Sequence, residues 1–254
     1  SVDAVPNAQQ KVKLKYSKKT YDLRQKHIKN ILNGSKFFLR KGDYASAYGY
    51  IDAFYTYTTS KRDSLLYRLA YQAALCGYLT NQPKHTLKYI DKAIEAASRG
   101  DKPILQEYKV RTYALLKNDS LWVRELHTGV NLYPEYDYFF VNLIDWYNSQ
   151  RMTKEACELA DSLIQVVSAE KAIYWYTKCK MKLMENDYEA CIQFADSTIK
   201  RDPAYVDAYY NKGISYLNMA VIKKDTACND IKDKRFAEDR KAIHELYAQA
   251  MRCM

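Results

Sequence analysis

Apolar residues recur along the chain with the spacing of amphipathic helices. From about Thr20 to Leu39 they return at intervals of three and four residues. Further along, Pro203 lacks a backbone N–H and has a fixed φ, so one helix stops before it and another can start there. In that next helix Tyr209 and Tyr216 share one face, and Gly213 lets a paired helix come close. The pattern therefore predicts helices joined in pairs.

The stretch 187–218 also resembles the second half of one tetratricopeptide (TPR) unit followed by the first half of the next. The matching parts are the turn at Asp187-Tyr188, the helix end at Asp202-Pro203, and the aromatic–small–aromatic series Tyr209, Gly213 and Tyr216. The resemblance covers about residues 28–219. It implies an all-α, right-handed superhelical solenoid of about six helix pairs, which stack because one pair cannot bury its apolar face alone.

Counting in steps of the 34-residue TPR period divides the body into six units. They span roughly 28–61, 67–100, 103–136, 137–170 and 172–205, and the sixth starts at Val206. Small residues twelve positions apart should face each other within a unit, as in Ser35/Ala47, Ala74/Thr86 and Cys179/Cys191. The third unit is the least typical, since Val110 and Trp122 take those positions. We expect the two cysteines to be free thiols with Cα atoms within about 7 Å.

The last unit departs from the family pattern because no turn follows Met219. We expect a lengthened first helix to about Lys224, a polar loop near 225–232, and a second helix from about Arg235 to the end. Such a long-armed last unit resembles those of bacterial envelope TPR proteins, which implies a periplasmic or cell-envelope location, with the cytoplasm as the alternative. The chain starts at Ser1 without Met, which fits a removed signal peptide and a trimmed chain equally.

Nearly all of the net charge of +10 lies at the N-terminus, because residues 1–41 hold eleven Lys or Arg and only two acids. We assign 1–19 to a basic arm, flexible or extended, and 20–254 to the solenoid. The arm is either a solvated leader or a contact to an anionic membrane surface through a cluster of lysines, namely Lys11, Lys13, Lys15, Lys18 and Lys19. Binding to nucleic acid is the third interpretation of the arm. It is disfavoured because only Tyr16 and Tyr21 could stack on bases and the body carries no basic excess.

Catalytic and cofactor motifs are missing from the sequence. It contains no GxGxxG, GxxxxGK[ST], HExxH or GxSxG, and its six cysteines have no metal-ligand spacing. Its four histidines fall in different units. We therefore expect a protein that is not an enzyme, with no cofactor, no metal and no small-molecule substrate.

The resemblance implies a protein or peptide partner in a concave groove, which the first helix of each pair lines in TPR solenoids. The inner positions that could anchor or orient such a partner are Tyr71, Tyr78, Arg111, Tyr138, Asp145, Tyr176, Lys180 and Tyr210. The alternative reading of the tyrosines is packing between repeats. Leu32 and Lys36 stand where TPR co-chaperones hold a Lys and Asn clamp, so a chaperone-tail ligand is disfavoured.

Overall fold

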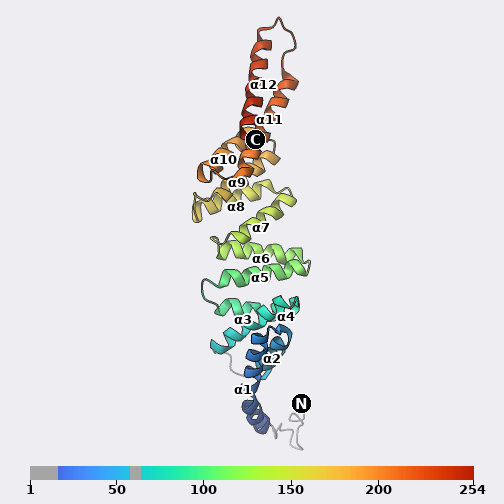
Figure 1. Ribbon diagram of the computed structural model, residues 1–254, viewed down its shortest axis with the longest axis vertical. Coiled ribbons are helices and arrows are strands. Elements are labelled where there is room, and N and C mark those ends of the chain that lie inside the picture. Colours follow the sequence, from blue (N-terminus) through green and yellow to red (C-terminus); the bar gives the residue numbers. More distant parts are fainter. Residues whose placement is uncertain (1–16, 58–63) are drawn as a thin grey trace, which may run out of the picture. The chain divides into compact units, whose positions relative to one another are not determined.

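The computed structural model describes residues 17–57 and 64–254, which form twelve α-helices and contain no strand (Figure 1). The helices are α1 (Ser17–Lys41), α2 (Tyr44–Tyr57), α3 (Ser64–Leu79), α4 (Pro83–Ala96), α5 (Lys102–Leu115), α6 (Asp119–Leu132), α7 (Asp137–Ser149), α8 (Thr153–Val166), α9 (Ala172–Met184), α10 (Tyr188–Arg201), α11 (Val206–Thr226) and α12 (Lys234–Cys253). The expected all-α class and the sequential helix pairs are confirmed. None of the helices in these ranges is long and apolar enough to cross a bilayer.

The chain divides into two units, the first ending at Gly129 and the second beginning at Val130. In the first unit each of α1 to α5 packs on the helix that follows or precedes it in the chain. In the second unit α7 to α12 do the same, and α9 also contacts α11. A first helix that touches the first helix of the next pair is what stacking of whole pairs requires.

The same turn joins the two helices in each of the first five pairs. In the fifth, Asn186 has a φ of 60°, its N–H donates to Leu183 O, and the Asp187 N–H donates to Lys182 O. These two bonds make a Schellman motif, which satisfies carbonyls at the helix end. Identical bond pairs close the other four turns around residues that also have positive φ, namely Gly42, Asn81, Lys117 and Arg151.

Small residues sit where the two helices of a pair approach closely, as the sequence predicted. Ser35, Ala47, Ala74 and Thr86 are all buried. Beside Thr86, Gly77 is equally necessary, because a Cβ at Gly77 would lie 2.5 Å from the Thr86 backbone nitrogen. Sequence reasoning did not single out that glycine.

The third pair has a buried polar cluster beside its two facing positions. Val110 is buried and Trp122 is half-buried. Next to them Gln106 Nε2 on α5 donates to Glu125 Oε2 on α6 at 3.1 Å, and both side chains are buried. Since buried polar groups need partners, this bond helps to fix how the two helices face each other.

The last pair is lengthened as predicted. Its first helix has 21 residues and its second has 20, against 13 or 14 in helices α5 to α10 (Figure 1). The predicted loop corresponds to residues 227–233. Gly213 does allow a close approach, since a Cβ there would lie 3.1 Å from Met254 Cγ. At the other end, α1 begins at Ser17, slightly before the predicted start.

Candidate peptide-binding surface

A cavity of about 460 Å³ opens in the first unit between α3, the end of α4 and the start of α5. Two tyrosines of α3 line it, Tyr67 and Tyr71, whose side chains are 41% and 38% exposed. The other lining residues are Arg68, Ala93, Ala96, Ala97 and Asp101. Exposed aromatic rings beside a hollow are the usual form of an anchor site for a binding partner.

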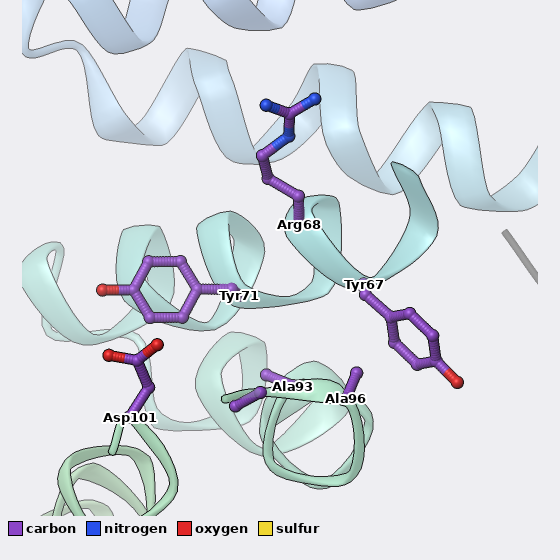
Figure 2. A pocket seen from close by; sticks show the side chains of 7 residues that line it. Tyr67, Arg68, Tyr71, Ala93, Ala96 and Asp101 are labelled. Carbon is purple, nitrogen blue, oxygen red and sulfur yellow. The ribbon is translucent and has the colours of Figure 1, made fainter. Parts of the chain in front are cut away.

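The cavity exists because α4 presents alanines to it. Ala93 is buried and Ala96 half-buried, and neither side chain reaches beyond Cβ, so the space between the two tyrosine rings stays open (Figure 2). The helix ends at Ala96, and Ala97 turns the chain into an extended conformation with φ −66° and ψ 156°. The floor of the cavity is therefore set by three small residues at one helix end.

A short loop holds Asp101 at the rim. Ser98 Oγ donates to Asp101 Oδ2 at 2.6 Å, and the Asp101 N–H donates to Ser98 O at 3.0 Å. Figure 2 shows the Tyr71 ring with its hydroxyl end toward Asp101, whereas Arg68 extends away from that carboxylate. One end of the cavity thus carries an aromatic face and a negative charge together.

Sequence reasoning identified Tyr71 but missed Tyr67, Arg68 and Asp101. Tyr67 lies four residues before Tyr71, so both fall on one helix face, and that spacing was the available signal. Asp101 could not be placed by helical spacing because it stands in the connection between two pairs. The cavity itself depends on the alanines of α4, which look like ordinary core residues in the sequence.

The other predicted groove residues of the first unit are already engaged by neighbours. Tyr78 stacks on Tyr108 of α5, with ring centroids 4.6 Å apart and planes at 27°. Arg111 Nε donates to Glu107 Oε1 at 2.7 Å within α5, and the Arg111 side chain is 48% exposed. Tyr78 therefore takes part in packing between pairs, which was the alternative reading for the tyrosines.

The predicted residues of the second unit differ widely in exposure. Tyr176 packs its ring against Tyr205, with centroids 4.7 Å apart, and burial raises the pKa of Tyr176. Tyr138 is half-buried and packs on Phe139. Asp145 is exposed on α7, Lys180 is half-buried on α9, and Tyr210 is 56% exposed on α11.

Lysines join successive pairs at a recurring place that the sequence analysis did not recognise. Each lies on the first helix of a pair and contacts an aspartate on the second helix of the preceding pair. The distances between Nζ and Oδ1 are 2.8 Å for Lys109–Asp91, 2.6 Å for Lys178–Asp161 and 2.5 Å for Lys212–Asp196. A Lys that follows an Asp by sixteen to eighteen residues was the signal for these ion pairs.

Most of the basic arm, residues 1–16, lies outside the described residues. Lys11, Lys13 and Lys15 lie outside the described residues, and Lys18 and Lys19 are in the first turn of α1, with Lys19 exposed. Across residues 17–57 and 64–254, no cluster of three or more His, Cys, Asp or Glu side chains could hold a metal ion.

Neither a protein-family model nor a curated protein matches the sequence, whereas solved structures match the fold. The C-terminal part of a TPR repeat-containing protein from Cytophaga hutchinsonii is 12% identical, with a TM-score of 0.52, over 84% of this chain and 78% of that one. A tetratricopeptide repeat protein from Parabacteroides merdae is 16% identical, with a TM-score of 0.51, over 89% of this chain and 99% of that one. These likenesses establish a TPR-like array of helix pairs, the fold that the sequence resemblance implied.

Proposed function

We propose that this chain is a non-catalytic scaffold that binds an extended segment of a partner protein, anchored in the cavity between α3, α4 and α5. The observation that carries the proposal is the pair of exposed rings, Tyr67 and Tyr71, over a floor of alanines. TPR arrays present extended surfaces of this kind to partners. Tyrosine suits an anchor site because it offers a large contact area at a low cost in conformational entropy.

The chemistry of the cavity favours a long side chain with an aliphatic stem and a cationic end. The stem would lie along the tyrosine rings, whose faces attract a cation. The cation would meet Asp101, whose carboxylate stands at the same end of the cavity as the Tyr71 hydroxyl (Figure 2). We therefore propose that the bound segment carries a Lys or Arg at its anchor position.

The proposal can be tested with a displayed library of random peptides panned on the full chain. Selected peptides should be enriched in Lys or Arg at one position. Tyr71→Ala should weaken their binding by more than about fivefold, the loss expected for removing an anchor contact of more than ~1 kcal/mol. Asp101→Asn should selectively weaken the peptides that carry the cation.

Leu79→Ala is the matched control, because Leu79 is an exposed residue at the end of the same helix and does not line the cavity. It should leave peptide binding unchanged. Equal binding by the wild type, Tyr71→Ala and Tyr67→Ala would remove the cavity from the proposal.

A further inference from the structure

One face of α11 is both apolar and exposed. Tyr210, Leu217 and Val221 are 56%, 38% and 44% exposed, and the half-buried Ile214 lies between them. Steps of four, three and four residues place these side chains in one line along the helix. We call this set of four residues the α11 stripe.

A different set of α11 residues is buried within the second unit. The buried residues of α11 lie on other sides of the helix, namely Ala208, Asn211, Gly213, Ser215 and Ala220. They pack where α11 contacts α9, α10 and α12. The stripe is thus a face of the helix that its own pair and the preceding pair leave partly uncovered. It is longer than α7 or α9 could present, since these have 13 residues against 21 in α11.

Opposite charges continue the stripe at its two ends. Asp207 stands one turn before Tyr210, and Lys224 stands one turn after Val221, and both are exposed. The line of apolar side chains is therefore extended by an acid at one end and by a base at the other.

We propose that the α11 stripe packs against the α11 stripe of a second copy of this chain, with the two helices antiparallel about a two-fold axis. The pattern reads the same in both directions once the second helix is reversed. Ile214 then meets Leu217 of the other copy, Tyr210 meets Val221, and Asp207 meets Lys224. A two-fold interface requires such self-complementarity, in which residue i contacts j and j contacts i.

The charged residues favour a second copy of this chain as the partner, with the two α11 helices antiparallel. Antiparallel pairing makes two Asp207–Lys224 ion pairs at the ends of the contact. Parallel pairing would oppose Asp207 to Asp207 and Lys224 to Lys224, which is repulsive at both ends. The apolar residues and the two charged residues are arranged symmetrically about one point, between residues 215 and 216. Binding of an unrelated partner would not require this symmetry.

The inference goes beyond the proposed scaffold function and uses a different part of the chain. A dimer formed through α11 would carry two copies of the α3–α4–α5 cavity. Two linked sites raise the effective affinity for a partner with repeated segments.

The test is the mass of the full-length protein in solution, measured by sedimentation equilibrium up to about 100 μM, a range that detects micromolar association. The wild type should be a dimer. Leu217→Glu and Val221→Glu should each weaken dimerisation by at least about tenfold, because a charge would be buried in an apolar contact. Ile231→Glu is the control, since Ile231 is 79% exposed in the α11–α12 loop and outside the stripe.

Charge exchange checks the antiparallel arrangement. Asp207→Lys alone and Lys224→Asp alone should each lower self-association, since each creates two like-charged pairs. Mixing these two variants should restore association as a heterodimer, and the double variant should dimerise like the wild type. Unchanged helical circular dichroism in every variant would show that folding is intact.

A monomeric wild type would overturn the inference, and so would a dimer that the stripe variants leave unchanged. These outcomes are separable from failure of the proposed function, because Tyr67 and Tyr71 lie in the first unit. Peptide binding there, measured on the full chain, should persist in a monomeric Leu217→Glu variant.

Discussion

Cys179 and Cys191 face each other between α9 and α10 with their Sγ atoms 3.5 Å apart, both fully buried as free thiols. They hold the small facing positions that the repeat register predicted, so the register is correct in the fifth pair. The thiol–thiol contact and burial raise the pKa of Cys179.

Because both side chains are fully buried, the two thiols should be unreactive in the folded protein. Under mild alkylation followed by mass spectrometry, we expect Cys228 and Cys253, which are partly exposed, to be labelled first. Cys179 and Cys191 should be labelled only when urea unfolds the second unit, because the thiolate is the reactive form and burial disfavours it. Labelling of both pairs at equal rates in the native protein would contradict this packing.

Gly77 and Gly49 form a matched pair for testing how closely helices approach. Gly77→Ala should lower the free energy of unfolding by about 1–3 kcal/mol, the range for overpacking, because its new Cβ would lie 2.5 Å from the Thr86 backbone nitrogen. Gly49→Ala places a Cβ with nothing within 4 Å, so it should raise stability by about 0.5–1 kcal/mol through helix propensity. Urea unfolding of both variants measures the contrast, and equal effects would refute the close approach at Gly77.

Two of the Schellman turns hold a non-glycine residue in a strained backbone conformation. Lys117 and Arg151 have φ values of 52° and 58°, in the left-handed region that costs a non-glycine residue about 1–2 kcal/mol. Lys117→Gly and Arg151→Gly should each raise the free energy of unfolding by up to about 1 kcal/mol, the relief being partly offset by the larger chain entropy of glycine.

Gly42→Ala is the reverse experiment at the corresponding turn of the first pair, where φ is 73° and a Cβ would meet nothing within 4 Å. It should lower stability by about 1 kcal/mol through backbone strain alone. Thermal melts of the three variants should give opposite signs for Gly42→Ala and the two changes to glycine.

Individual residues show how much of the structure could be predicted from the sequence. Spacing alone placed the facing residues Ala74 and Thr86 and the long α11, because helical period and helix-breaking residues are local properties. It did not reveal the cavity under Tyr71, which depends on where Ala93 and Ala96 leave a gap. Nor did it find the Lys109–Asp91 and Lys178–Asp161 ion pairs, because these contacts depend on how one pair stacks on the next.

The exposed face of α11 is a second feature that the sequence alone could not predict. The sequence marked Tyr210 as an inner position of the groove. Only the structure shows that the face stays uncovered as far as Val221 and ends in charged residues. Whether an apolar helical face is core or contact surface is decided by the neighbours that cover it, not by its own pattern.

Glu125 provides the pH-dependent prediction. It is 4% exposed, and burial opposes its ionisation. Hydrogen bonds from Gln106 and Lys109 outweigh that effect and lower the pKa of Glu125, and Lys109 Nζ lies 3.1 Å from Glu125 Oε2. A carboxyl whose folded-state pKa is lowered stabilises the fold above its unfolded pKa, and this stabilisation is lost as pH falls through the folded pKa.

Glu125→Gln keeps the shape of the side chain and removes its charge. At pH 7 the variant should be less stable than the wild type by about 1–3 kcal/mol, since the charged hydrogen bond from Lys109 is lost. The deficit should begin to shrink as pH falls below about 4.3, the usual pKa of Glu, because the unfolded wild-type chain then binds a proton. It should disappear as pH falls through the lowered folded-state pKa of Glu125. Urea unfolding of both proteins from pH 7 to pH 3 measures the difference in their free energies of unfolding. The other acidic residues are the same in both proteins, so their contribution cancels in this difference. A deficit that stays constant to pH 3 would show that Glu125 acts through its shape and not through its charge.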